Sequence, residues 1–321
     1  MQTLRWGILG TGTIATKFTQ GLDAADGHHV AAVGSRTLES ADRFGEAHGI
    51  PTRHGSYADL AADPEVDAIY VSTPHTFHRE NTLLCLEGGK AVLCEKPFAL
   101  NAAQAREMVA AARSSNLFLL EAMWTRFNPV MEHVRHLVGS GELGEIRQMV
   151  VDFGFRAEFD ASGRLFDPAL GGGALLDVGI YCASLARMVF GRAPSEVTST
   201  ADVGSTGVDE QCAWTFRYDD GALAAMTAAV RTETPQEAVI CGTRGTVRIP
   251  SFWCPDRLIH DGREIRFDIA GNGYHYQAIE VARCLAEGQT ESPTLPLDET
   301  VEIMETLDRV RAPWGLRYPG E

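Results

Sequence analysis

A carboxylate and a phenol stand four residues apart inside an apolar stretch, GGGALLDVGIYCASLARMVF (Gly171–Phe190). The pattern from Ala174 onward predicts a buried helix, on which Asp177 and Tyr181 would share one face with Cβ atoms roughly 5–6 Å apart. A buried carboxylate is costly unless it is paired. The helix therefore carries either a structural polar pair or two titratable groups directed at a reactant.

A lysine, Lys96, ends the apolar run KAVLCEK (90–96) and precedes Pro97. If this run is a parallel strand, its carboxyl end faces the ligand crevice of the sheet. A phenol with its ordinary pKa of about 10 is a poor base at neutral pH, but a nearby ammonium favours the phenolate. Lys96 and Tyr181 together could remove or supply the proton of a substrate hydroxyl, whereas most lysines, taken singly, are surface residues.

A glycine-containing turn follows the first apolar run. GILGTGTIATKF places Gly10, Gly12 and Ala15 in a G-x-G-x-x-A arrangement, in which small residues permit a tight turn, a close pyrophosphate and close helix packing. The following helix offers free N–H groups to phosphates. A structural turn without a ligand is the alternative. The residues expected to bind a dinucleotide here are Gly10, Thr11, Gly12, Thr13 and Ile14.

The end of the second predicted strand indicates which dinucleotide binds. NAD-binding chains usually carry Asp or Glu there, but this chain reads Gly34-Ser35-Arg36-Thr37. The hydroxyls of Ser35 and Thr37 and the guanidinium of Arg36 could bind a 2′-phosphate. We therefore expect NADP rather than NAD, with a solvated loop cation as the alternative interpretation of Arg36.

The elements that would position these residues alternate between strand and helix in the first third of the chain. Strands are expected at 4–10, 29–35, 67–73, 90–96 and 117–123, and helices at 12–24, 37–47, 76–88 and 101–114. This alternation predicts an α/β fold with a doubly wound parallel sheet. We expect a Rossmann domain over residues 1–123.

Beyond residue 123 the pattern changes to that of an α+β domain. Strands are expected at 145–159, 196–203, 210–218, 222–231, 237–243 and 246–250, and helices at 127–139, 274–288 and 297–311, besides the helix of Asp177 and Tyr181. The segment FRYDDGALAAM predicts a hairpin, because Asp-Gly tolerates positive φ. A substrate-binding and oligomerisation domain with a largely antiparallel, mixed sheet is expected over 124–321, with a C-terminal helix able to pack back on the first domain.

Composition excludes several functional classes. The chain has 321 residues and a formal net charge of −15 without a dense basic cluster, which argues against nucleic acid as a partner. Seven scattered cysteines without C-x-x-C argue against a zinc site and a disulfide framework. We recognise no secretory signal in the sequence, and we expect no apolar stretch to be long enough to span a membrane. We expect a cytoplasmic protein without a metal.

Four segments in this order resemble the Gfo/Idh/MocA oxidoreductase family: GTGTIA, STPHTFH, EKP and GGGALLDVGIY. Within it, EAMWTRFNP (121–129) and Tyr181 are similar to the branch of dimeric dihydrodiol dehydrogenase and D-xylose dehydrogenase. Asn128 and His75 depart from the family pattern, where an aromatic residue and Asn are expected.

The resemblance implies that Lys96, Asp177 and Tyr181 form the catalytic group and that family members dimerise through the C-terminal sheet. It also implies that a nicotinamide and its ribose contact residues after the predicted strands. These cofactor-binding residues are Ser72, Thr73, Pro74, His75, His78, Glu95, Lys96, Trp124 and Arg126. Trp124, Phe155, Tyr181 and Trp253 are expected at the substrate, although Phe153, Phe155 and Trp253 could equally be core aromatics.

Three functions are compatible with these residues. The first is an NADP-dependent dehydrogenase acting on a small polyol, an aldose or a cyclic vicinal diol. The second is a glycosidase that uses a tightly bound nucleotide for transient oxidation. The third is a redox sensor that binds NADP without turnover, which would not need both Lys96 and Tyr181.

Overall fold

The computed structural model describes residues 3–321, which form two compact units. Unit 1 contains the chain up to Ala99, Ala103–Phe127 and Ala270–Thr300. Unit 2 contains Leu100–Ala102, Asn128–Ile269 and Val301–Glu321. The chain thus returns to unit 1 after completing most of unit 2. A single boundary at one position in the sequence therefore does not separate the two units.

Unit 1 is built on a six-stranded parallel sheet of order β3-β2-β1-β4-β5-β6, the doubly wound order predicted from the sequence. The strands are β1 (Leu4–Leu9), β2 (His28–Gly34), β3 (Thr52–His54), β4 (Ala68–Val71), β5 (Ala91–Glu95) and β6 (Leu119–Ala122). Strand β3 and the short helix α3 (Tyr57–Ala62) were not predicted from the sequence. The carboxyl ends of β5 and β6 are neighbours, with Glu95 paired to Ala122.

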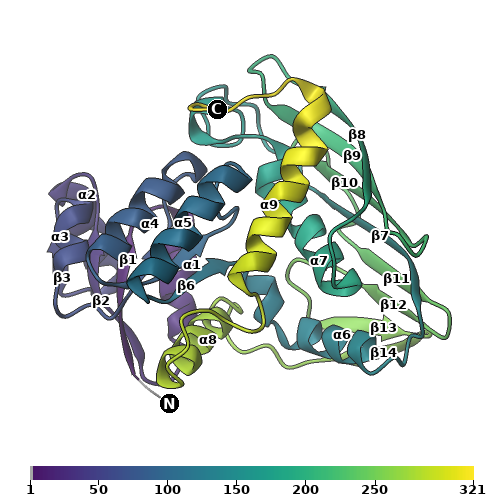
Figure 1. Ribbon diagram of the computed structural model, residues 1–321. Coiled ribbons are helices and arrows are strands. Elements are labelled where there is room, and N and C mark those ends of the chain that lie inside the picture. Colours follow the sequence, from purple (N-terminus) through teal and green to yellow (C-terminus); the bar gives the residue numbers. More distant parts are fainter. Residues whose placement is uncertain (1–2) are drawn as a thin grey trace. The chain divides into compact units, whose positions relative to one another are not determined.

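Helices connect these strands (Figure 1). They are α1 (Thr13–Leu22), α2 (Leu38–His48), α3 (Tyr57–Ala62), α4 (His78–Glu87), α5 (Ala102–Ser115) and α8 (His275–Ala286), with 3-10 turns η1 (His75–Phe77) and η2 (Trp124–Phe127). The four predicted connecting helices are confirmed within two or three residues at each end. The later helix α8 contacts α1 and η2 and so belongs to the same unit.

Unit 2 contains an eight-stranded mixed sheet of order β14-β13-β12-β11-β7-β10-β9-β8, in which only β7 and β10 run parallel. The strands are β7 (Ile146–Gly154), β8 (Glu196–Val203), β9 (Asp209–Arg217), β10 (Leu223–Ala229), β11 (Ala238–Gly242), β12 (Thr246–Ile249), β13 (Arg257–His260) and β14 (Arg263–Arg266). The predicted hairpin is confirmed, because β9 and β10 pair antiparallel around a turn closed by Gly221. The predicted strand 145–159 ends early, at Gly154, and β13 and β14 were not predicted.

One face of this sheet carries α6 (Pro129–Gly139), α7 (Ile180–Phe190) and α9 (Leu297–Arg311) (Figure 1). The first turn of α9 belongs to unit 1 and the remainder to unit 2. Two 3-10 turns, η3 (Pro168–Leu170) and η5 (Ala312–Trp314), and a π-helical turn, η4 (Leu175–Gly179), complete the unit.

The helical stretch Pro168–Phe190 corrects one expectation. It is 23 residues long, and its most apolar 18-residue window has a mean hydropathy of 1.5, enough in length and composition to cross a membrane. Its most apolar window is 89% buried, which is the environment of a core helix, and η4 and α7 pack on β7 and β10. The sequence analysis underestimated this stretch because Gly171–Gly173 and Asp177 interrupt its apolar pattern.

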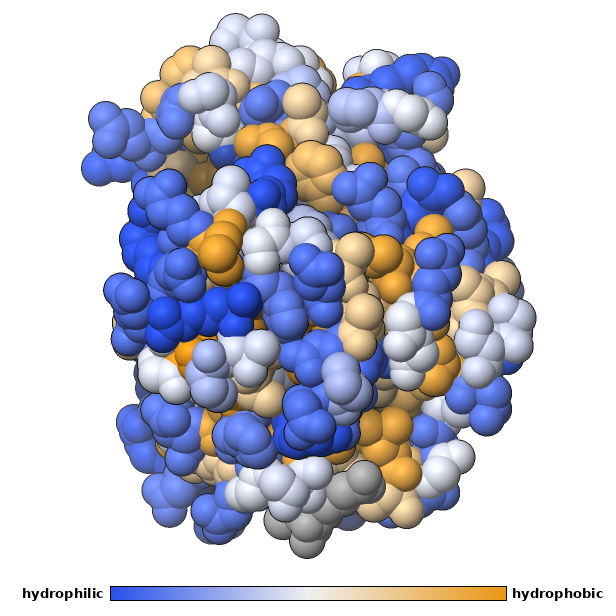
Figure 2. Space-filling view, turned by 90° about the vertical axis from the view of Figure 1, so that its left-hand side faces the viewer, coloured by the Kyte–Doolittle hydropathy of each residue, from blue (hydrophilic) through white to orange (hydrophobic). Residues whose placement is uncertain are grey.

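The cores of the two units consist of the apolar strand residues and the helix faces that cover them. Trp6, Ile8 and Phe18 are fully buried in unit 1, and Trp214 and Phe216 in unit 2. On the face of the molecule seen in Figure 2, hydrophilic residues predominate and hydrophobic residues lie scattered among them. This is the usual surface of a chain whose large apolar side chains are packed inside.

Candidate active site

The turn between β1 and α1 fits a phosphate group at its backbone. Gly10 has a φ of +102°, and an added Cβ would lie 3.1 Å from the Ser72 hydroxyl, so glycine is required there. Gly12 is exposed and is the N-cap of α1, with no side-chain hydrogen bond to the first helical turn. The first N–H groups of α1 are therefore not capped by a side chain, as a diphosphate site requires. Thr11 and Ile14 are half-buried and Thr13 is exposed at the same turn.

Ser72 supports this turn from β4. Its buried hydroxyl donates a hydrogen bond to the Leu9 carbonyl at 2.9 Å. The side chain of Ser72 thus holds the end of β1 below the glycine turn, and its expected contact with the cofactor stays a prediction.

The segment Gly34–Thr37 after β2 contains one cation, Arg36, which is exposed, and it contains no carboxylate. Ser35 is buried, and its backbone N–H donates to the His54 carbonyl at 3.1 Å. Arg36 is exposed, and Thr37 is exposed while its hydroxyl accepts from the Ser40 backbone N–H as the N-cap of α2. Arg36 and Thr37 are thus accessible to a 2′-phosphate, whereas Ser35 is largely enclosed.

Buried carboxylates hold the loop that carries Lys96. Glu95 accepts hydrogen bonds from the Tyr70 hydroxyl and, at 3.1 Å, from the Lys96 backbone N–H. Glu121 on β6 accepts from the Phe98 backbone N–H at 3.1 Å, and burial raises the pKa of Glu121 to about 7. The Lys96–Pro97 peptide is cis. The loop is thus anchored on both sides of Lys96, and Glu95, expected at the cofactor, is assigned to holding the loop.

His78 links this loop to the one after β4. Its Nδ1 lies 2.8 Å from the Pro97 carbonyl oxygen and its Nε2 lies 2.8 Å from the Thr73 carbonyl oxygen. The ring is fully buried, and burial lowers the pKa of His78 to about 4, so the imidazole is neutral near pH 7. A neutral ring donates only one of these bonds at a time. The ring has no exposed surface, and the expectation that His78 lines a ribose stays a prediction.

Three further residues after β4, Thr73, Pro74 and His75, were predicted to contact the cofactor, and this stays a prediction. Thr73 is half-buried and accepts from the Asn81 amide at 3.1 Å, Pro74 is exposed, and His75 is buried with its ring 5.7 Å from that of His78.

An aromatic pair lies after β6. Trp124 is buried and stacks on Tyr274, with ring centroids 4.4 Å apart and an interplanar angle of 16°. Arg126 is buried and forms an ion pair with Glu299, and its expected role at the cofactor stays a prediction. Tyr274 was not predicted, since it lies 150 residues further along the chain and carries no local motif.

In unit 2, Asp177 is paired with an arginine that the sequence analysis did not identify. The Nη1 of Arg164 donates to the Asp177 Oδ1 at 2.8 Å; 6% of the Asp177 side chain is exposed, against 58% of the Arg164 side chain. Asp177 lies in the π-helical turn η4, and Tyr181 in the first turn of α7. The α-helical spacing assumed for this pair is therefore wrong over Leu175–Gly179. Such turns occur often at functional sites.

One aromatic ring, that of Phe153, contacts Tyr181 and leads to a second, Trp253. The Phe153 ring meets the Tyr181 ring edge-on at 5.4 Å and stacks on Trp253 at 5.3 Å. The Trp253 indole N–H donates to the Gln236 side-chain oxygen at 2.8 Å. Phe153 from β7 is thus the aromatic residue in contact with Tyr181. Phe155 is half-buried just beyond the strand, and its contact with a substrate stays a prediction.

Two glycines before η4, Gly172 and Gly173, and Gly179 at its end pack against the protein itself. A Cβ on Gly172 would lie 2.7 Å from the Leu165 carbonyl oxygen, and one on Gly173 would collide with Asp209. A Cβ on Gly179 would lie 3.1 Å from the Trp214 ring. These glycines permit close packing of η4 on its neighbours.

Metal-binding and thiol chemistry find little support in the residues that the structure describes. In residues 3–321 no group of three or more His, Cys, Asp or Glu is placed to hold a metal ion. The seven cysteines are free thiols, and burial raises the pKa of the Cys85 thiol to about 12.

Comparisons with known proteins match the chain over nearly its whole length. A model described as "Oxidoreductase family, NAD-binding Rossmann fold" matches residues 4–122, and a "GFO/IDH/MocA C-terminal domain" model matches residues 131–248. The trans-1,2-dihydrobenzene-1,2-diol dehydrogenases of Xenopus laevis and Homo sapiens are 40% and 39% identical, over 98% of this chain and 99% and 98% of theirs. The solved aldose-aldose oxidoreductase from Caulobacter crescentus, complexed with glycerol, is 26% identical with a TM-score of 0.88, covering 99% of this chain and 100% of that one.

Proposed function

Because the chain belongs to the GFO/IDH/MocA family of oxidoreductases, we propose that it is a dehydrogenase that oxidises a hydroxyl of a small polyol, an aldose or a cyclic vicinal diol, or reduces the corresponding carbonyl. The observation that carries this proposal is the full-length identity of 40% to trans-1,2-dihydrobenzene-1,2-diol dehydrogenase. The aromatic pair of Phe153 and Trp253 beside Tyr181 supports it, because such rings pack against the flat apolar face of a sugar or a dihydrodiol.

The proposed chemistry divides between the cofactor and the chain. A bound nicotinamide supplies or accepts the hydride. Tyr181 takes or returns the proton of the substrate hydroxyl, and the ammonium of Lys96 stabilises the phenolate and binds the same hydroxyl. Asp177, oriented by Arg164, hydrogen-bonds and orients the substrate. The aromatic rings exclude water from the phenol.

Incubation with NADP⁺ or NAD⁺ and a panel of aldoses, inositols and trans-dihydrodiols tests this function. We expect reduced nicotinamide to form with at least one of these substrate classes, measured by its absorbance. Protein that is purified with its nicotinamide already bound, and that cleaves a glycoside without consuming added cofactor, would instead be the glycosidase. Protein that binds NADP but reduces none with any substrate would be the sensor.

For the cofactor, we propose NADP. The support is the exposed Arg36 and Thr37 after β2, with no carboxylate in Gly34–Thr37. Arg36→Gln should weaken binding of NADP⁺ by about 10–100-fold, because a hydrogen bond to a charged group contributes about 1.5–3 kcal/mol. Binding of NAD⁺ should change little, since it has no 2′-phosphate.

Calorimetric titration of both nucleotides measures this difference. Arg43→Gln is the matched control, because the Arg43 guanidinium is exposed on α2, where it pairs with Glu39 at 3.7 Å and donates to the Ser40 hydroxyl at 3.3 Å. Equal weakening of NADP⁺ and NAD⁺ by Arg36→Gln would show that Arg36 does not bind the 2′-phosphate.

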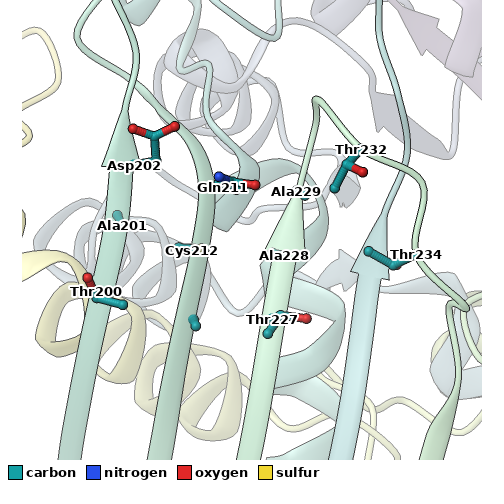
Figure 3. Close-up of a pocket in the computed structure, with 11 residues that line it drawn as sticks. Thr200, Ala201, Asp202, Gln211, Cys212, Thr227, Ala228, Ala229, Thr232 and Thr234 are labelled. Atoms are coloured by element: carbon teal, nitrogen blue, oxygen red, sulfur yellow. The ribbon is translucent and has the colours of Figure 1, made fainter.

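We also propose that the protein is a homodimer that forms through the outer face of the unit 2 sheet. Small residues dominate that face: Thr198, Thr215, Ala225 and Val150 form a row across β8, β9, β10 and β7. Val150 and Leu223 are each 48% exposed. A shallow pocket of Thr and Ala side chains lies at one end of the same strands (Figure 3). A flat apolar face of this kind is typical of protein interfaces.

Ala225→Arg should convert the dimer into a monomer, because it places a charge in the middle of that row. Size-exclusion chromatography with light scattering should give twice 34.8 kDa for the wild-type protein and 34.8 kDa for the variant. Leu38→Arg, which changes a side chain 53% exposed on α2, should remain dimeric. A dimeric Ala225→Arg variant would place the interface elsewhere.

The thiols suggest a compartment. Five of the seven free cysteines are buried, as small apolar side chains are. We propose that the protein works in a reducing environment such as the cytosol.

A further inference from the structure

The helical run that carries Asp177 and Tyr181 begins at a residue that cannot cap it. Ala174 is the N-cap of η4 and offers no side-chain acceptor to the first free N–H groups. The acceptor comes from the first residue of β9 instead, because the Leu175 backbone N–H donates to the Asp209 Oδ2 at 2.7 Å. A carboxylate at this end also interacts favourably with the helix dipole.

Asp209 is enclosed where η4 begins. Its side chain is fully buried, and among residues 3–321 its Oδ1 has no hydrogen-bond partner. This oxygen lies against Gly173, where an added Cβ would collide with it. Tyr318 reaches the same turn, since its hydroxyl donates to the Gly172 carbonyl at 2.7 Å. A buried, half-satisfied carboxyl lowers stability, so its presence calls for an explanation beyond packing.

We propose that Asp209 is a positioning residue: by fixing the N–H of Leu175 it sets the start of η4, and with it the placement of Asp177 and Tyr181. Asp177 follows Leu175 by two residues, and its own backbone N–H donates to the Gly173 carbonyl at 3.2 Å. Any shift at this start is therefore transmitted along the helical hydrogen bonds to the reactive side chains. The inference rests on the roles proposed above for Asp177 and Tyr181.

The protonation of Asp209 identifies the right conservative variant. Burial raises the pKa of Asp209 from 3.8 to about 7, against the opposing hydrogen bond from Leu175. The charged or titratable groups facing it are Cys212 on β9, Arg311 on α9 and Tyr318 in the C-terminal segment. Because a neutral carboxyl is accommodated, Asp209→Asn should preserve the acceptor for Leu175.

The same raised pKa predicts a pH dependence of stability. Between about pH 4 and 7 the folded protein keeps a proton that the unfolded chain releases, so the contribution of Asp209 to stability falls as pH rises and levels off above about 7. Asp209→Asn removes this decline. In urea denaturation the variant should therefore gain stability relative to the wild-type protein from pH 5 to pH 8.

Hydrogen exchange of the unliganded protein and steady-state kinetics test the positioning role together. In Asp209→Ala, peptides covering 174–181 should exchange about tenfold faster, and kcat should fall about tenfold or more with an unchanged Kd for the cofactor. Asp209→Asn should restore both. Asp220→Ala is the matched control, because the Asp220 carboxylate accepts a backbone N–H bond from Ala222 in an exposed turn of the same sheet.

The inference is overturned if Asp209→Ala exchanges like the wild-type protein, or if it exchanges faster but keeps its kcat. If Asp209→Ala does not fold, Tyr318→Phe is the second test. This variant should exchange the backbone hydrogens of residues 171–173 faster and should have a lower kcat. Unchanged exchange and an unchanged kcat would overturn the proposal. An active Tyr181→Phe variant would contradict the proposed function itself. An inactive Tyr181→Phe beside a fully active Asp209→Ala contradicts this inference alone.

Discussion

Tyr181→Phe should lower kcat by about 10²–10⁴-fold, the usual contribution of a general acid or base. The substitution removes only the hydroxyl, so the ring contacts with Phe153 can persist and the fold should be kept. The glycine turn that fits the nucleotide lies in unit 1, and binding of NADPH should therefore remain nearly unchanged. Stopped-flow or steady-state turnover with fluorescence titration of NADPH separates the two effects.

Tyr218→Phe is the matched control for this variant. The Tyr218 hydroxyl is buried in unit 2 and has no hydrogen-bond partner among the described residues, while its ring stacks on Phe190 at 4.1 Å. Its loss should leave turnover and stability close to those of the wild-type protein. Turnover of Tyr181→Phe within tenfold of the Tyr218→Phe control would remove Tyr181 from the mechanism.

The parallel sheet of unit 1 could be predicted because each of its longer strands is an uninterrupted apolar run between helical patterns. Fully buried strands such as β4 (Ala68–Val71) leave that signal regardless of their partners. The three-residue β3, half-exposed and containing Arg53, leaves none. The four-residue strands β13 and β14 carry charged residues and were missed for the same physical reason, since β14 at the edge of the sheet and its short neighbour show no continuous apolar run.

Local motifs located the reactive residues but not the residues that hold them. Asp177 and Tyr181 stand out because a polar group in an apolar run is costly. The residues that hold them come from other parts of the chain. Arg164 pairs with Asp177, Tyr274 stacks on Trp124, and Asp209 caps the helical turn at Leu175. Their roles depend on tertiary contacts that spacing does not encode.

Two motif residues that were expected at the cofactor are held by the protein itself. His78 and Arg126 were expected at the cofactor because they lie in motif segments, yet the first bonds two backbone carbonyls and the second pairs with Glu299. Motif residues often support a site without touching its ligand. The π-helical turn at Leu175–Gly179 was likewise not predicted, since the same residues would suit an α-helix.

Lys96→Met should lower kcat by about 10²–10³-fold at pH 7 and should change the shape of the pH profile. Without the ammonium, a phenol returns toward its ordinary pKa of about 10. Oxidation of a hydroxyl needs the phenolate as the base, so the residual activity should rise steadily between about pH 7 and 10, about tenfold for each pH unit. In the wild-type protein the corresponding rise should be complete at lower pH. The measurement is kcat for alcohol oxidation at saturating cofactor across this range.

Lys90→Met separates this electrostatic role from a structural one. Lys90 precedes the same strand, β5, but its buried ammonium donates to the carbonyls of Asp63 and Val66. Its loss should leave buried carbonyls unsatisfied, so it should lower the midpoint of thermal unfolding while kcat per folded molecule and its pH profile stay unchanged. If Lys96→Met behaves like Lys90→Met, with lower stability and an unshifted pH profile, the ammonium of Lys96 holds the loop and does not act on the phenol.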